Sequence, residues 1–268
     1  SDMSGKSIFV PLISPLDEQS KICEPSVRRL LHCSRPYVDG YIPCLTSGEG
    51  WRLGRRDWQR MLELTLTHAQ DKTVIAGIER ATTTEVIEYA LLAQKLGAQA
   101  VMFTSPFAAG TRQEAIIEHY REVHDSTSLD IFIYNESALS GNEKTFETLL
   151  AIAELPRVIG IKDSPSLPRS QKQIELLRAE GLDYFIGWEM QLARDLESDG
   201  NVVSLANLEP GLCRLAIGAR QQSIGKLIEA LNEHFELGAD DWYAQVKKEL
   251  KARGVISTDR VLAEKGSV

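Results

Sequence analysis

Eight short apolar segments alternate with longer amphipathic segments from one end of the chain to the other, and this alternation constrains the fold more than any other feature. Short apolar runs between amphipathic stretches are typical of repeated strand–helix units around a parallel sheet. Eight such units predict a (β/α)8 TIM barrel, an α/β fold whose active site lies at the carboxyl ends of the strands. The predicted strands are residues 8–13, 40–45, 73–78, 100–104, 130–135, 157–162, 183–187 and 201–206.

The length of the chain fits one barrel domain followed by a helical extension. With 268 residues, 43% of them apolar, the chain can bury a full core. We expect residues 7–222 to form the catalytic barrel and residues 223–268 to form additional helices that pack on it. Two apolar stripes at helical spacing support this extension, and we interpret them as surfaces that pack on the barrel wall or on a second subunit. They comprise Leu227, Leu231, Phe235 and Leu237, and then Trp242, Val246 and Leu250.

Charge and composition exclude several classes of partner. The chain has 30 basic and 38 acidic side chains and a formal net charge of -8, without a lysine- and arginine-rich stripe, so we expect no nucleic-acid partner. No apolar run reaches the roughly 18 residues that span a bilayer, and the first residues lack the apolar core of a signal peptide. These features predict a cytoplasmic protein without a membrane partner.

The cysteines and histidines do not indicate a metal site. The four cysteines form no CxxC pair and lack zinc-ligand spacing, so we expect reduced, mostly buried thiols and no disulfide. The five histidines lie in segments that we predict to be helical, away from the strand ends where catalytic groups gather, and we interpret them as structural. They are His32, His68, His119, His124 and His234.

Lys162 ends the predicted strand 157–162 and so stands at the carboxyl end of a segment that is typical of a buried parallel strand. A lysine with a pKa of about 10.4 is only roughly 0.04% neutral at pH 7, whereas burial can lower that pKa by several units. A drop of about three units corresponds to roughly 4 kcal/mol and makes the amine a nucleophile for carbonyl groups. Alternatively, Lys162 extends to water and pairs with Asp163, and this strand alone leaves both interpretations open.

The period of two along a strand places Lys162 near Tyr134. Val158, Gly160 and Lys162 share one face of their strand, and Gly160 leaves space beneath the lysine; Phe132 and Tyr134 share a face of the preceding strand. Consecutive barrel strands are neighbours about 4.8 Å apart, so we expect the phenol and the amine to meet. This pair suits imine chemistry, in which lysine attacks a ketone and tyrosine relays protons. The alternative is a core tyrosine whose hydroxyl bonds to the backbone.

A loop of small residues follows the second predicted strand. Thr46, Ser47, Gly48, Glu49 and Gly50 suit a turn that directs hydroxyls and N–H groups at an anion, for which a carboxylate is the natural choice. Loops of this composition also serve as simple connections. Glu49 is a candidate anchor that holds the loop down.

Four segments together resemble the dihydrodipicolinate synthase / N-acetylneuraminate lyase family of pyruvate-dependent class I aldolases. They are residues 45–49, 134–135, 160–163 and 199–204, and the resemblance in order and spacing extends over nearly the whole chain. It implies a TIM barrel with extra carboxyl-terminal helices, a Schiff-base lysine at Lys162, a proton-relay tyrosine at Tyr134, and carboxylate binding at Thr46 and Ser47 beside Gly48. It also implies a small-molecule 2-oxo acid substrate, a homotetramer or homodimer, and neither a metal nor an organic cofactor.

The chain departs from the synthase branch of this family at several positions. Ala108 stands where the synthases carry a tyrosine of a proton relay that crosses a subunit boundary, Glu136 and Ser137 replace an apolar–proline pair, and Leu139 replaces an arginine for a dicarboxylate substrate. We therefore do not expect dihydrodipicolinate synthase activity.

Residues 138–141 resemble the lyase branch instead, as does a hydroxyl at Ser164. The same comparison predicts that the polar half of the pocket is lined by Gly187, Glu189, Val203 and Ser204, and that Trp188 narrows it.

Three functions remain open on this basis. The first is a class I aldolase or lyase that forms or cleaves a 2-oxo acid of the 2-keto-3-deoxy sugar acid or 4-hydroxy-2-oxo acid type, with pyruvate as product or donor. The second uses the same imine to dehydrate or deaminate a 2-oxo-3-deoxy acid, with Glu136 as an additional acid or base. The third is a catalytically degenerate binding protein.

Overall fold

The computed structural model describes residues 5–192, 197–217 and 222–262. Its eight strands follow one another in chain order around a closed parallel barrel. The predicted (β/α)8 fold is confirmed. The strands are β1 (Ser7–Pro11), β2 (Gly40–Ile42), β3 (Thr73–Ile78), β4 (Ala100–Phe103), β5 (Asp130–Asn135), β6 (Val158–Asp163), β7 (Asp183–Ile186) and β8 (Gly200–Val202).

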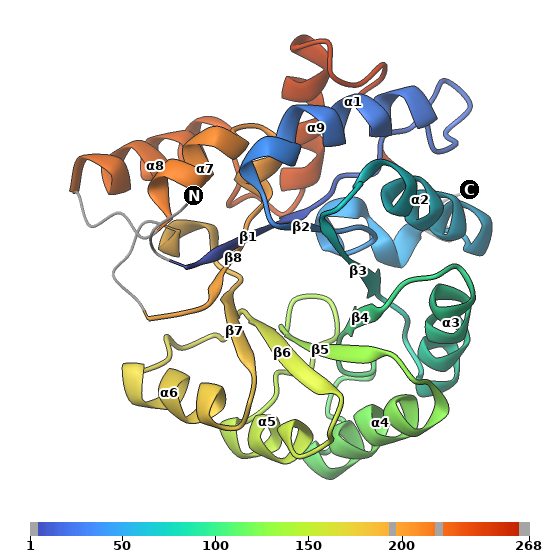
Figure 1. Cartoon of the computed structure of the whole chain (residues 1–268), viewed down its shortest axis with the longest axis vertical. Coiled ribbons are helices and arrows are strands. Elements are labelled where there is room, and N and C mark those ends of the chain that lie inside the picture. Colours follow the sequence, from blue (N-terminus) through green and yellow to red (C-terminus); the bar gives the residue numbers. More distant parts are fainter. Residues whose placement is uncertain (1–4, 193–196, 218–221, 263–268) are drawn as a thin grey trace. The chain divides into compact units, whose positions relative to one another are not determined.

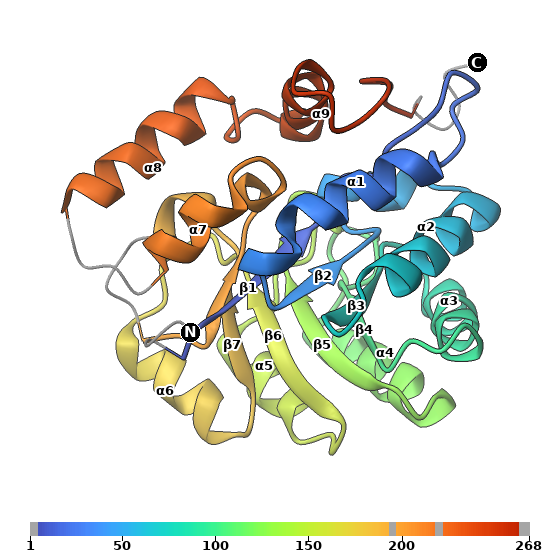
Figure 2. The same ribbon diagram turned by 45° about the horizontal axis from the view of Figure 1, so that its top comes forward.

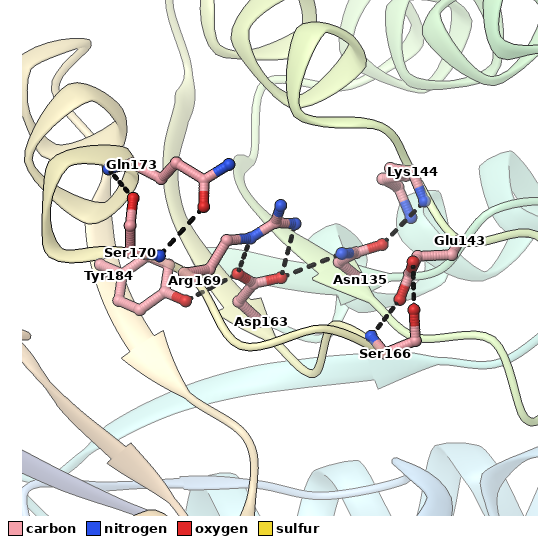
Figure 3. A network of polar contacts seen from close by, with 9 residues as sticks. All are labelled: Asn135, Glu143, Lys144, Asp163, Ser166, Arg169, Ser170, Gln173 and Tyr184. Atoms are coloured by element: carbon pink, nitrogen blue, oxygen red, sulfur yellow. Dashed lines mark hydrogen bonds and ion pairs between the residues drawn. The ribbon is translucent and has the colours of Figure 1, made fainter.

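Helices connect the strands, and local signals in the sequence mark several helix starts. Pro25 occupies the first turn of α1, and the Thr82 hydroxyl caps α3 by accepting the N–H of Glu85. Ser170 and Gln173 form a reciprocal capping box at the start of α6 (Figure 3). The helices are α1 (Glu24–Ser34), α2 (Arg55–His68), α3 (Thr83–Lys95), α4 (Gln113–Ser126), α5 (Phe146–Ala153), α6 (Gln171–Ala179), α7 (Pro210–Ala216), α8 (Gln222–His234) and α9 (Trp242–Ala252).

The described residues form two compact units. The second unit comprises residues 76–187 and 197–200 and contains β4 to β7 with α3 to α6. In this unit the helices lie along the outer side of the strands (Figure 1). Ile131, Ile133 and Ile161 on β5 and β6 are fully buried, and burial of one such side chain contributes about 1.5–3 kcal/mol.

The first unit comprises residues 5–75, 188–192, 201–217 and 222–262. In it, β1 pairs with β2, with Phe9 opposite Gly40. The segment that follows α9 lies beside α1 (Figure 2), where Arg29 Nε donates to the carbonyl of Val255 at 2.8 Å and the Ser257 N–H donates to Ser26 Oγ at 3.0 Å. Helices α8 and α9 fall within the predicted extension, and these contacts fasten its end to α1.

Several local predictions were wrong. The strands predicted at 8–13 and 40–45 end at Pro11 and Ile42. The strand predicted at 201–206 ends at Val202, because the carboxylate of Glu189 accepts the N–H groups of Ser204 and Leu205, and residues 204–207 form the short 3-10 helix η5. In the first predicted stripe Leu227 is exposed and the neighbouring Ile228 is buried. Of the four cysteines two, Cys44 and Cys213, are buried, whereas Cys33 is exposed.

No helix among the described residues has both the length and the apolar character that a bilayer crossing requires.

Candidate active site

Lys162 and Tyr134 meet at the carboxyl ends of neighbouring strands in the second unit. They are register partners on β6 and β5, and Lys162 Nζ donates to Tyr134 Oη at 3.3 Å. Nζ also lies 4.3 Å from the centroid of the tyrosine ring. Both residues are buried, with 7% and 6% of their surfaces exposed. The predicted proximity of the amine and the phenol is confirmed, while their catalytic roles stay a prediction.

The alternative interpretation, in which Lys162 extends to water and pairs with Asp163, does not agree with the structure, because Lys162 is buried and other residues bind the Asp163 carboxylate. Successive side chains on a strand point to opposite faces, and the buried carboxylate of Asp163 receives donors from three other residues (Figure 3). Arg169 Nε donates at 2.9 Å, Asn135 Nδ2 at 2.9 Å and Tyr184 Oη at 2.6 Å. Asp163 therefore fixes the end of β6 next to Lys162.

Burial shapes the electrostatics of this network. Desolvation raises the pKa of the Tyr184 hydroxyl well above its ordinary value, and the nearby negative charge of Asp163 raises it further. The phenol therefore stays protonated and serves as a donor to the carboxylate. The Arg169 guanidinium supplies the compensating charge, with only 11% of its side chain exposed.

Gly187 and Ser164 lie against the lysine. A Cβ atom at Gly187 would lie 2.2 Å from Ser164 Oγ and 3.2 Å from Lys162 Cε, so position 187 tolerates no side chain without displacing one of them. The predicted space above Gly160 is not open. The ring of Phe132 fills it, 2.4 Å from the position of a Cβ at Gly160.

This unit contains a second buried amine that the sequence patterns did not indicate. Lys144, in the segment between β5 and α5, is 2% exposed, and its Nζ donates to the carbonyl of Tyr134 at 2.9 Å. Desolvation lowers the pKa of Lys144 to about 7, against the opposing influence of Glu136 and Asp163. No sequence pattern indicated this residue, because it lies in a connection without periodicity.

In the first unit the predicted carboxylate loop forms the 3-10 helix η2 (Thr46–Gly48). Ser47 and Ser204 come together, with their Oγ atoms 2.6 Å apart, and both side chains are buried. Gly48 lies so close to the residue that follows β1 that a Cβ there would be 2.6 Å from the carbonyl oxygen of Leu12. Thr46 is half-buried at the start of the turn.

Helix α9 holds this loop from one side. Trp242 Nε1 donates to Ser47 Oγ at 3.0 Å, so a residue that we had assigned to a packing stripe contacts a predicted substrate-binding residue. Lys247 Nζ lies 2.6 Å from a carboxylate oxygen of Glu49, and both side chains have no exposed surface. Glu49 has a left-handed backbone conformation, with φ of 56°, and it also accepts the N–H of Leu262 at 2.7 Å. The anchoring role that the sequence suggested for Glu49 agrees with these contacts.

The remaining predicted pocket residues of the first unit have varied surroundings. The Glu189 carboxylate accepts the N–H groups of Ser204 and Leu205 and so caps η5. Val203 is fully buried immediately before η5. Trp188 is 46% exposed.

Glu136, Ala108 and Leu139 lie in loops of the second unit. The Glu136 carboxylate accepts the N–H groups of Leu139 at 2.7 Å and of Ser140 at 3.0 Å, which makes it a brace for the loop after β5. Ala108 is exposed, and its carbonyl accepts a hydrogen bond from Asn142 Nδ2 at 2.7 Å. Leu139 is half-buried.

The chemistry available to the second unit follows from these contacts. A buried amine held beside a phenol is able to attack a carbonyl carbon once the amine is neutral. The phenol is within reach to exchange protons with the oxygen that leaves.

Comparison with known proteins agrees with this geometry. Residues 4–263 match the model of the dihydrodipicolinate synthetase family. A 4-hydroxy-tetrahydrodipicolinate synthase of Parvibaculum lavamentivorans is 30% identical over 225 residues, which are 78% of this chain and 72% of that protein. A synthase of the same name from Anaplasma marginale is 31% identical over 169 residues, 62% of this chain, and the match spans only 56% of its length.

A solved structure shows the same fold. The chloride-inhibited dihydrodipicolinate synthase of Acinetobacter baumannii, crystallised with pyruvate, superposes with a TM-score of 0.85 at 24% identity, over 97% of this chain and 94% of that one. The chain belongs to the dihydrodipicolinate synthetase family, whose enzymes are pyruvate-dependent class I aldolases and lyases.

Proposed function

We propose that this protein is a class I aldolase or lyase that forms an imine between Lys162 and the carbonyl carbon of a 2-oxo acid, with pyruvate as product or donor. The observation that carries the proposal is the 3.3 Å hydrogen bond from Lys162 Nζ to Tyr134 Oη between two buried side chains. Family membership supports it.

The proposed reaction begins when the neutral amine of Lys162 adds to the ketone carbon. Tyr134 donates its proton to the oxygen of the carbinolamine, and water departs as the C=N bond forms. In the cleavage direction the tyrosinate then accepts the proton of the substrate's 4-hydroxyl group. The bond between carbons 3 and 4 breaks, an aldehyde leaves, and the electron pair remains on the enamine of pyruvate.

We further propose that Thr46 and Ser47, beside Gly48, bind the carboxylate of the 2-oxo acid with Ser204 and Val203 next to them. Gly187 is proposed to contact the substrate beside Lys162. The buried pair of Ser47 and Ser204 hydroxyls supports this assignment. Ser47 Oγ accepts a hydrogen bond from the indole N–H of Trp242, so the Ser47 hydroxyl is able to donate its own hydrogen bond to Ser204 or to a carboxylate.

The proposed substrates are 2-keto-3-deoxy sugar acids or 4-hydroxy-2-oxo acids, as in the lyase branch of the family. The residues at two positions support this choice over the dicarboxylate chemistry of the synthases. Leu139 offers no charge to a second carboxylate, and exposed Ala108 offers no relay hydroxyl. We propose Ser164 and Glu189 as polar contacts of the substrate chain, and a homotetramer or homodimer as the assembly.

Borohydride reduction in the presence of pyruvate tests the imine. The expected result is a carboxyethyl group on the tryptic peptide that contains Lys162, and its loss in the Lys162→Ala variant. Lys144 provides an internal control, because burial lowers the pKa of this second amine to about 7, yet it donates to a backbone carbonyl. An adduct on Lys144, or no adduct together with full turnover by Lys162→Ala, refutes the proposal.

A further inference from the structure

Lys144 is a buried titratable group that the proposed reaction does not use. Among the residues that the structure describes, its Nζ has one hydrogen-bond acceptor, the carbonyl oxygen of Tyr134 at 2.9 Å, and it lies 5.2 Å from the centroid of the Tyr120 ring. An ammonium group has three N–H donors. One carbonyl acceptor and one aromatic ring therefore compensate only in part for the water that the charged group loses on burial. The position is therefore able to hold the amine in either protonation state.

The surroundings of the amine divide into groups that favour its charge and groups that oppose it. The carboxylates of Glu136, on the loop after β5, and of Asp163, on β6, favour the cation. Helix α4 contributes the neutral ring of His119 and the Tyr120 phenol, whose pKa values are shifted toward the uncharged forms by burial. Desolvation of Lys144 outweighs the two carboxylates, and its pKa falls to about 7.

The same segment is connected to Asn135 and Asp163, the residues that follow the two proposed catalytic residues in their strands (Figure 3). The backbone N–H of Lys144 donates to Asn135 Oδ1 at 2.9 Å, and Asn135 Nδ2 donates to Asp163 at 2.9 Å. Asn135 follows Tyr134 in β5, and Asp163 follows Lys162 in β6. The backbone of Lys144 is thus hydrogen-bonded to the end of β5, and through Asn135 to the end of β6.

We infer that Lys144 is a positioning residue for Tyr134, and that gain or loss of the Lys144 proton strengthens or weakens its hold on the end of β5. The inference rests on the proposed function, because it requires Tyr134 to act as the proton relay. A hydrogen bond from an ammonium is about twice as strong as one from a neutral amine. Tyr134 carries both the carbonyl that Lys144 binds and the hydroxyl that meets Lys162, so a looser backbone displaces the phenol.

Exchange of the methyl protons of pyruvate in D2O, followed by NMR, measures the proton relay without knowledge of the second substrate, because the exchange passes through the imine and its enamine. The exchange rate at saturating pyruvate is compared between the wild type and Lys144→Met from about pH 6 to about pH 9, on either side of the pKa of Lys144. Taking the ratio cancels any pH dependence that the two proteins share. Lys172→Met, which removes an exposed lysine of α6, is the matched control.

The wild type is expected to be about tenfold faster than Lys144→Met below pH 7, where the amine is charged, and about twofold faster or less above pH 8. Lys144→Gln keeps a neutral N–H donor with a reach one bond shorter and should show the same trend, which keeps the test available if the methionine variant does not fold. The control variant should match the wild type at every pH.

A ratio that stays constant across this pH range, for both variants, overturns the inference. If neither variant folds, the 13C NMR titration of lysine Cε in the wild type decides, and the absence of any lysine titrating below about pH 9 overturns it. Borohydride trapping distinguishes a failure of the role inferred for Lys144 from a failure of the proposed function. Normal trapping at Lys162 with a constant ratio refutes only the role of Lys144, whereas wild-type protein that is not trapped refutes the proposed function.

Discussion

Replacement of Asp163 by asparagine should destabilise the second unit by several kcal/mol. The carboxylate is fully buried, and it pairs with an arginine of which only 11% of the side chain is exposed. Removal of one member of a buried ion pair costs about 3–5 kcal/mol, because the remaining charge stays buried without a partner. In the variant an NH2 group replaces one of the two carboxylate oxygens. This donor then faces another donor, either Asn135 Nδ2 or the groups of Arg169 and Tyr184. We therefore expect a loss of about 3–5 kcal/mol in the free energy of unfolding.

Urea unfolding followed by circular dichroism measures this loss, and thermal unfolding should show a decrease in Tm of about 10 °C. Glu118→Gln is the matched control, because it removes a carboxylate from the pair Arg121–Glu118 on α4, where the side chains are 49% and 50% exposed. Such a surface pair contributes less than about 1 kcal/mol. If the free energy of unfolding of Asp163→Asn is no lower than that of Glu118→Gln, the hydrogen bonds and ion pair of Asp163 do not stabilise the protein as the buried contacts indicate.

The remaining predictions concern pH, substrate binding and steric fit. His119 donates from Nε2 to the Thr104 carbonyl, and burial lowers its pKa from 6.5 to about 4. The unfolded chain binds this proton at a higher pH than the folded chain, so the free energy of unfolding should fall by about 3 kcal/mol as pH drops through that window. Urea unfolding of the wild type and His119→Gln checks this, and equal pH slopes contradict it. Trp242→Phe keeps an aromatic ring but removes the donor to Ser47, and it should raise KM for pyruvate about three- to tenfold with kcat unchanged. Steady-state kinetics in which kcat falls instead argue against carboxylate binding at Ser47. Gly187→Ala places a Cβ 2.2 Å from Ser164 Oγ and 3.2 Å from Lys162 Cε, and should slow borohydride trapping at least about tenfold. The double variant Gly187→Ala/Ser164→Ala should recover part of the trapping rate. Trapping of the single variant Gly187→Ala at the wild-type rate would show that Gly187 does not confine the Lys162 side chain.

Periodicity in the sequence was sufficient to predict the barrel. Eight apolar runs separated by helical segments leave few other ways to bury a parallel sheet, and the strands lie where the runs lie. The strand expected at 201–206 was too long, because the carboxylate of Glu189 from another part of the chain binds the N–H groups that a ladder would have used. A local pattern does not contain such a contact.

The same periodicity brought Tyr134 and Lys162 together, because alternation along a strand and adjacency of consecutive strands are both local rules. The sequence therefore determined the fold class and the meeting of the amine with the phenol. Only the tertiary structure decided that Asp163 pairs with Arg169, that Lys144 lies buried against the Tyr134 carbonyl, and that Trp242 contacts Ser47. Arg169, Lys144 and Trp242 come from connections or a helix whose own sequence permits burial or exposure. The partner of each side chain depends on which polar groups lose water and remain within hydrogen-bonding distance once distant segments have packed. A local sequence pattern does not contain that information.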